Sequence, residues 1–226
     1  MRLLKDRQFN IVSLKTLVTL IRKKQPLPDK TVAITFDDGF SNLHSVAYPI
    51  LKSCGFTATI FLVPSYCGKN NQWLGQPKGI PILDLLDWKR IREMNDDGFD
   101  FGAHTMEHAD LSTLPAERAR EEIVNSKLAI QERLERPVRF FAYPYGSVTR
   151  EIRSIVSDEF SGACSVEMDF STLRSDDYML PRIDMYYFSD NNCFASVGTY
   201  KFHLFVKILS YIRTFRRRMN LRTIGV

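Results

Sequence analysis

Short runs of apolar and β-branched residues recur along the chain, separated by longer stretches of mixed polarity. Runs of this length that end at Gly, Pro or Asp predict buried strands. Between them, apolar positions at helical spacing predict helices at 42–53, 87–95, 116–135 and 148–158. The predicted strands are 31–36, 58–63, 99–104, 139–144, 161–166 and 178–184. Strands that alternate with helices indicate an α/β fold with parallel strands, either a barrel or an open sheet.

The clearest helix covers residues 116–135. One face carries the small and apolar residues, and Glu and Arg lie elsewhere. Before the helix at 87–95, Asp87 is a suitable N-cap, and Gly98 follows its end. The segment 64–83 is rich in Gly, Pro and Asn and predicts a long loop. The face predicted to be buried in 116–135 consists of Ala119, Ile123, Ser126, Ile130 and Leu134.

The charge is uneven along the chain. The formal net charge is +5, and residues 201–226 carry basic but no acidic side chains. The middle of the chain is mixed in sign, so nucleic-acid binding is not expected. Within 201–219, apolar residues at helical spacing predict a basic amphipathic helix, which can either contact an anionic membrane surface or pack on the domain. Those apolar residues are Phe205, Ile208, Ile212, Phe215 and Met219.

Cysteine usage and the N-terminus bear on the compartment. None of the cysteines Cys54, Cys67, Cys164 and Cys193 forms a C-x-x-C pair or a disulfide-like framework. The first residues have a basic start, but polar residues interrupt the apolar ones and no cleavage site follows. We therefore expect a cytoplasmic protein that can lie at the inner surface of a membrane.

Polar residues follow several predicted strands. Asp37 and Asp38 follow 31–36, His104 is the last residue of 99–104, and Tyr145 follows 139–144. The carboxyl ends of parallel strands form the active site in both barrels and open sheets. We therefore predict a site where these residues meet.

The chemistry of these residues fits a metal. His104 and His108 are four residues apart, so both imidazoles can reach one ion. Each motif alone has a simpler explanation, since D-D-G often makes a turn and H-x-x-x-H is often structural. Together at strand ends, two histidines and one carboxylate leave open positions on a metal, and the second carboxylate can act as a base.

Three ordered motifs, TFDDG at 35–39, HTMEH at 104–108 and FAYPYG at 141–146, resemble those of the NodB-type polysaccharide deacetylases of carbohydrate esterase family 4. The resemblance covers about residues 9–185. It implies a NodB-like distorted (β/α) barrel of about seven parallel strands. It also implies metal-dependent removal of N-acetyl groups from amino sugars. We divide the chain into an N-terminal helical extension (1–30), this domain (31–190) and a basic amphipathic tail (191–226).

The resemblance also implies roles for individual residues. Asp37 corresponds to the catalytic base, and Asp38, His104 and His108 correspond to the ligands of one divalent metal. Zn²⁺ is the first choice, and Co²⁺ and Ni²⁺ remain open because imidazole and carboxylate suit all three. The backbone N–H of Tyr145 corresponds to a donor for the oxyanion.

The chain departs from the family pattern at two places. Ala142 stands where an arginine often orients the base, and no L-x-H motif supplies a general acid. Our hypothesis is that Arg182 enters the site from the last strand and replaces the missing arginine. The general acid stays unassigned, because His203 lies in the tail and His44 is expected on a helix face.

The substrate predicted from the resemblance is an N-acylated amino-sugar glycan, either a polymer, an oligomer or lipid-linked. Trp73, in the polar loop, is the candidate for stacking on a sugar, together with Pro144 and Tyr145. Trp88 is expected to pack in the core. Two alternatives are a hydrolase of a non-sugar (cyclic) amide and an inactive carbohydrate-binding relative.

Overall fold

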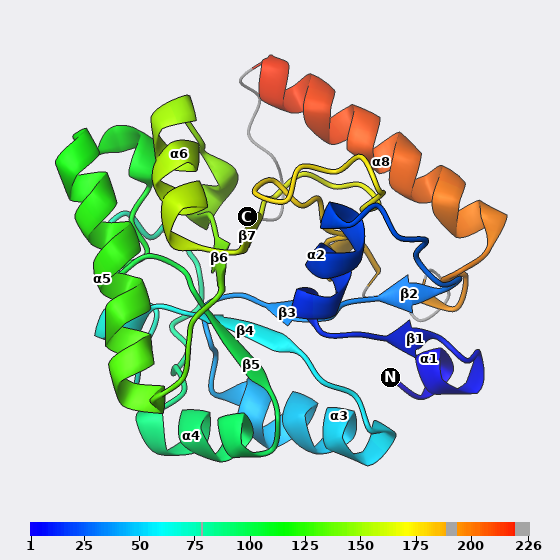
Figure 1. Ribbon diagram of the computed structural model, residues 1–226, viewed down its shortest axis with the longest axis horizontal. Coiled ribbons are helices and arrows are strands. Elements are labelled where there is room, and N and C mark those ends of the chain that lie inside the picture. Colours follow the sequence, from blue (N-terminus) through cyan, green and yellow to red (C-terminus); the bar gives the residue numbers. More distant parts are fainter. Residues whose placement is uncertain (78, 189–193, 220–226) are drawn as a thin grey trace.

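The computed structural model describes residues 1–77, 79–188 and 194–219. Its centre is a five-stranded parallel sheet in which the strands follow one another in chain order (Figure 1). The described part of this sheet does not close on itself, because β3 and β7 remain its outer strands. The α/β fold predicted from the alternating pattern is confirmed. The strands are β3 (Thr35–Phe36), β4 (Thr59–Leu62), β5 (Asp100–Ala103), β6 (Phe140–Ala142) and β7 (Gly162–Cys164).

The strand predicted at 31–36 is divided between two sheets. β2 (Thr31–Val32) pairs in parallel with β1 (Asn10–Ile11), whereas β3 pairs with β4. The chain therefore changes its strand partner at residues 33–34. With the five central strands, these two make seven parallel strands in the described part of the chain.

The strand predicted at 178–184 is reduced to a single bridge between Leu180 and Cys164. The N–H of Leu180 still donates to Ala163, and the N–H of Arg182 donates to Glu167. Pro181 lies between them, where a backbone N–H would face away from β7, so its missing donor costs no hydrogen bond to that strand. This segment nevertheless brings Arg182 alongside the carboxyl end of β7.

Helices follow the strands around the outside of the sheet (Figure 1). The predicted helix at 42–53 consists of a π-helical turn, η1 (Leu43–Ala47), and α3 (Tyr48–Cys54), which ends at Gly55 with a left-handed backbone (φ +71°). Asp87 caps the next helix by accepting a hydrogen bond from the N–H of Arg90. The others are α4 (Trp88–Asp96), α5 (Ala116–Leu134) and α6 (Arg150–Glu159).

The N-terminal segment packs onto this core. It contains α1 (Arg2–Asp6) and α2 (Leu14–Arg22), as the predicted helical extension requires, but also strand β1. The buried face of α2 contacts Phe61 and Phe140 of the sheet. That face consists of Leu14, Val18 and Ile21.

The C-terminal helix α8 (Tyr200–Arg218) confirms the helix predicted at 201–219. It packs beside the N-terminal segment and the short helix η5 (Met185–Phe188). The predicted boundary at 190–191, Cys193 and Arg222 lie outside the described residues. No helix in the described part of the chain is long and apolar enough to cross a membrane.

Candidate metal centre

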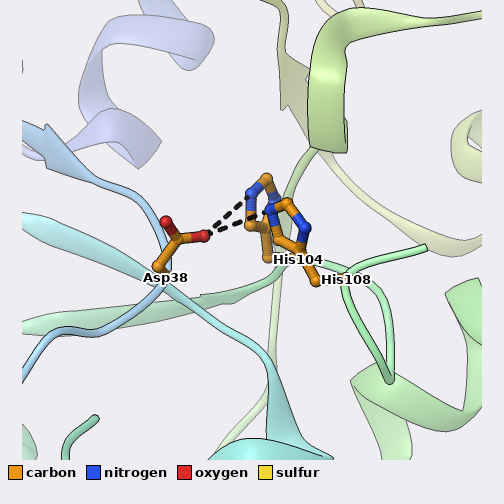
Figure 2. A group of neighbouring side chains, drawn as sticks. All are labelled: Asp38, His104 and His108. Carbon is orange, nitrogen blue, oxygen red and sulfur yellow. Dashed lines mark ion pairs between the residues drawn. The ribbon is translucent and has the colours of Figure 1, made fainter. Parts of the chain in front are cut away.

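Three potential metal ligands converge at the carboxyl ends of the central strands. Asp38 follows β3, His104 follows β5, and His108 lies in the loop beyond it. Asp38 Oδ1 lies 3.5 Å from His104 Nε2 and 3.3 Å from His108 Nε2 (Figure 2). One ligand atom from each residue lies within 4.8 Å of the others. The structure thus brings together the three residues predicted from the motifs.

The imidazole of His104 presents a lone pair to this point. Its Nδ1 lies 2.8 Å from the carbonyl oxygen of Ala142, which can only accept, so Nδ1 carries the hydrogen. Burial lowers the pKa of His104 and favours the neutral ring. Nε2 is then an unprotonated acceptor directed at Asp38.

His108 is held in a similar way. Its Nδ1 lies 3.0 Å from the phenol oxygen of Tyr145, which leaves Nε2 facing Asp38. A metal-binding histidine commonly uses one nitrogen for the ion and the other for such an outer contact. The hydroxyl of Tyr145 is a contact that the sequence motifs did not predict.

The three converging atoms have the chemistry of a cation site. Asp38 Oδ1 is buried and has no hydrogen-bond partner among the described residues. Buried polar atoms are rarely left unpaired, and here an acceptor oxygen faces His108 Nε2 and the unprotonated Nε2 of His104. Convergent lone pairs repel one another, and a divalent ion would satisfy all of them. The residues therefore fit a metal of the class that binds carboxylate and imidazole.

Asp37, beside this triad, is paired with Arg182. The two guanidinium nitrogens donate to the two carboxylate oxygens at 2.7 and 2.8 Å. Burial alone would raise the pKa of Asp37, but the charge and hydrogen bonds of Arg182 outweigh it and lower the pKa to about 2. The Asp37 side chain is still 33% exposed, so a substrate can reach it. The approach of Arg182 expected from the sequence is therefore observed.

The backbone at the site is unusual. Asp38, Thr105, His108 and Tyr145 all have positive φ, between 57° and 68°. For residues other than glycine this conformation costs about 1 kcal/mol or more, and it is found preferentially at functional sites. The last residue of the PYG motif, Gly146, has to be glycine, because its φ is +70° and an added Cβ would lie 2.0 Å from the side chain of Val166.

Glu122 of α5 holds the loop that carries His108. One of its carboxylate oxygens accepts hydrogen bonds from the N–H groups of Met106 and Glu107, both at 2.9 Å. Burial raises its pKa, and these hydrogen bonds act in the opposite direction. The sequence pattern predicts that the glutamates of this helix lie away from its buried face. This prediction is wrong for Glu122, which is only 5% exposed. Its spacing of three from Ala119 and four from Ser126 was the available signal.

Trp73 is a core residue. It is 5% exposed, and its indole stacks on the imidazole of His108 with ring centroids 4.2 Å apart. The loop folds back on itself, with Leu85 donating to the carbonyl of Lys69, and this closure buries the ring. The prediction that Trp73 offers a face to a sugar is therefore wrong.

Pro144 is also buried, in the short helix η4 (Pro144–Gly146), and its predicted contact with substrate finds no support. Tyr145 is only partly buried. The role of its backbone N–H as an oxyanion donor stays a prediction. Trp88 packs against the core as expected.

The chain has four histidines, and two of them are engaged away from this centre. His44, in η1, pairs with Glu93 at 3.2 Å and stacks on Tyr48. His203, in α8, stacks on Phe170 with centroids 4.1 Å apart. Both histidines therefore contact side chains outside the candidate ligand triad, and the general acid stays unassigned.

A cavity opens beside Asp37. Its volume is about 380 Å³, and Phe36, Phe40, Asn42 and Val46 contribute to its lining. It offers apolar surface and one amide next to the carboxylate, so a small polar ring could lie against Asp37.

Residues 24–159 match the model of the family described as polysaccharide deacetylase. The chain belongs to the polysaccharide deacetylase family. The resemblance inferred from the three motifs is thereby confirmed.

Several relatives of this deacetylase-family chain are known. A poly-beta-1,6-N-acetyl-D-glucosamine N-deacetylase of Staphylococcus aureus (strain MRSA252) is 27% identical over 190 residues, which are 80% of this chain and 62% of the relative. YxkH of Bacillus subtilis (strain 168) is 26% identical over 151 residues, 67% of this chain and 50% of the relative. The chain thus spans between half and two thirds of the length of these curated relatives.

Solved structures of deacetylases show the same fold. The Streptococcus pyogenes deacetylase PplD, in complex with acetate, superposes with a TM-score of 0.70 at 23% identity, over 80% of this chain and 76% of PplD. IcaB from Ammonifex degensii gives a TM-score of 0.69 at 23% identity, over 85% of this chain and 82% of IcaB. The curled parallel sheet of this family, a distorted barrel, is confirmed.

Proposed function

We propose that the protein is a metal-dependent hydrolase that removes N-acetyl groups from amino sugars of a glycan. The observation that carries the proposal is the convergence of Asp38, His104 and His108 on one point, beside the Asp37–Arg182 pair. Binding of a carbohydrate alone requires neither a ligand triad nor a base next to it. The geometry therefore favours catalysis over an inactive binding relative.

Asp38, His104 and His108 would hold the ion, with Zn²⁺ as the first choice and Co²⁺ or Ni²⁺ as alternatives. When bound, a divalent ion supplies a Lewis acid that polarises the acyl carbonyl and acidifies water. Ala142 and Tyr145 keep the two imidazoles turned toward it.

Asp37 is proposed as the base that takes a proton from the attacking water. Its low pKa keeps it ionised at neutral pH but makes it a weak base, so it depends on a water that is already acidic. Arg182 is a positioning residue, because it holds both carboxylate oxygens and fixes the direction of the carboxylate.

The same carboxylate can complete the reaction. Once Asp37 has accepted the proton, its low pKa makes the protonated form a strong acid. It can then pass that proton to the amine nitrogen as the C–N bond breaks, which releases acetate and the amino sugar. We assign the role of general acid to Asp37 because His44 and His203 both contact side chains outside the ligand triad. The N–H of Tyr145 is the proposed donor to the oxyanion formed in between.

The substrate class comes from the family and from the cavity. The staphylococcal relative is named for poly-β-1,6-N-acetyl-D-glucosamine. The cavity beside Asp37 offers the ring of Phe40 and the amide of Asn42, a combination suited to the apolar face and acyl amide of a sugar. We therefore take N-acetylglucosamine oligomers as the substrates to test.

The test combines metal content with acetate release. Purified protein would be analysed for bound metal, and acetate release from β-1,6-linked and β-1,4-linked N-acetylglucosamine oligomers would be measured before and after chelation. Asp37→Asn keeps the size of the side chain and removes its basicity, so it is the matched inactive variant.

The expected result is about one ion per chain and chelator-sensitive acetate release that Asp37→Asn abolishes. Metal binding without acetate release from either oligomer would refute the proposed substrate class and favour another amide. Failure to bind any of the three metals after supplementation would refute the proposed mechanism and favour a binding protein.

A further inference from the structure

The C-terminal helix α8 has one face that is fixed to the rest of the protein. Phe202 and Val206 are 5% and 0% exposed and pack with Leu4, Met168 and Phe188. On the same face, Arg213 donates to Asp184 at 3.0 Å. The helix is therefore an integral part of the fold.

A second face of α8 is apolar and uncovered. Leu204, Ile208 and Phe215 are 49%, 47% and 63% exposed, and they fall on one line of the helix at intervals of four and seven residues. Figure 1 shows α8 at the edge of the molecule. We call the exposed line the outer stripe; it consists of Leu204, Ile208, Tyr211, Ile212, Phe215 and Met219, all at least 42% exposed.

The outer stripe is bordered by positive charge. Lys201 and Lys207 are exposed. The sequence has three further arginines at positions 216–218. No acidic residue occurs between 201 and 226. Lys207 pairs with Asp169 and Arg213 with Asp184, and these pairs neutralise only part of the charge. An apolar line flanked by cations suits an interface with buried apolar groups and surrounding anions.

We propose that the outer stripe of α8 docks the protein on an anionic lipid surface, with the helix lying in the plane of the headgroups. An apolar contact between two copies would also cover the stripe, but it would bring their basic residues together at a cost in repulsion. Anionic headgroups would attract the same residues. The charge pattern therefore favours lipid over a second copy of the chain.

Docking would also fix the direction of the active site. Arg213 reaches Asp184, two residues beyond Arg182, and the carbonyl of Val166, whose side chain lies against Gly146 of the PYG turn. α8 is thus tied to the segments that carry Arg182 and Tyr145. If the protein acts as the proposed deacetylase, this arrangement suits glycans held at a membrane.

The test uses the full chain in vesicle flotation, without metal or glycan, so that its outcome is independent of the proposed activity. Phosphatidylcholine vesicles with and without about 30% phosphatidylglycerol would be compared. The test variant is Leu204→Ser/Ile208→Ser/Phe215→Ser, which changes only exposed side chains. The matched control is Ile50→Ser/Leu128→Ser, which removes exposed apolar residues from α3 and α5 (44% and 52% exposed).

Wild type and the control should bind the anionic vesicles at least about tenfold more tightly than the stripe variant. Binding of wild type should weaken with added salt and be weak on neutral vesicles. Circular dichroism checks that the variants fold, and the salt and lipid dependence of wild type tests the proposal without any variant. Absence of wild-type binding, equal binding to neutral vesicles, or equal binding by a folded stripe variant would overturn the proposal. A wild-type dimer that the stripe variant converts to a monomer would assign the stripe to a second copy instead.

Discussion

Arg182 holds both carboxylate oxygens of Asp37, at 2.7 and 2.8 Å, across 145 residues of sequence. Arg182 also donates from Nε to the carbonyl oxygen of Ser165. This third hydrogen bond holds the guanidinium in the orientation in which it contacts Asp37. We propose that this pair substitutes for the arginine that the family often has where this chain has Ala142.

Replacing Arg182 should affect turnover and spare the metal. We expect Arg182→Ala to lower kcat about a hundredfold, because the carboxylate of Asp37 loses its fixed direction. Arg182→Lys should be intermediate, since it keeps the charge but loses the two-pronged contact. Metal content should stay at the wild-type level in both. Steady-state kinetics with elemental analysis checks this, with the exposed Arg174→Ala as control. An unchanged kcat in Arg182→Ala would show that Asp37 needs no such partner.

The hydroxyl of Tyr145 should matter for metal affinity. Tyr145→Phe removes the contact with His108 Nδ1 and should weaken metal binding roughly tenfold to a hundredfold. Since the backbone N–H is retained, kcat at saturating metal should stay within about twofold of wild type. Competition with a chelator measures the affinity, and Tyr186→Phe, on an exposed tyrosine, is the control. Equal affinity in both variants would remove Tyr145 from the metal centre.

Glu122 should contribute to stability through the loop it holds. Glu122→Ala leaves the N–H groups of Met106 and Glu107 without their acceptor and should lower the free energy of unfolding by about 1–3 kcal/mol. The neighbouring Glu121 is exposed and pairs with the exposed Arg118, so Glu121→Ala should change the free energy of unfolding by less than about 0.5 kcal/mol. Urea unfolding in the presence of chelator separates this effect from metal binding. Similar losses in the two variants would contradict the role given to Glu122.

Neither His44 nor His203 should be required for catalysis. Loss of a general acid lowers rates about 10²- to 10⁴-fold, whereas we expect His44→Gln and His203→Gln to change kcat less than about threefold. The reason is that His44 stacks on Tyr48 and His203 on Phe170. Acetate release at saturating substrate is the measurement. A large loss in a folded variant would identify the missing acid and remove the second role from Asp37.

The residues that sequence reasoning located correctly share a local signal. Asp37, Asp38 and His104 each follow a short strand, and parallel strands bring such ends together. The cap at Asp87 and the buried face of α5 are likewise encoded by neighbours in sequence. These features could be predicted because few distant contacts decide them.

The features that were missed depend on distant packing. Trp73 is buried only because its loop closes over His108, and polar neighbours in sequence carry no sign of that closure. The strand at 31–36 divides because β1 pairs with its first half and β4 pairs with its second half. The burial of Trp73 and the division of the strand both depend on contacts between segments that are distant in sequence, and local composition carries no signal of such contacts.

The order of the sheet has a consequence for how the chain is synthesised. The strands β3 to β7 pair in the order in which they leave the ribosome, so each new strand can add to one already made. The three candidate metal ligands have all emerged at residue 108, whereas Arg182, the partner of Asp37, emerges much later. A nascent or truncated chain that ends between these two points therefore carries the candidate ligand triad but lacks the residue that orients the proposed base. The two parts of the proposed site are thus encoded at different lengths of the chain.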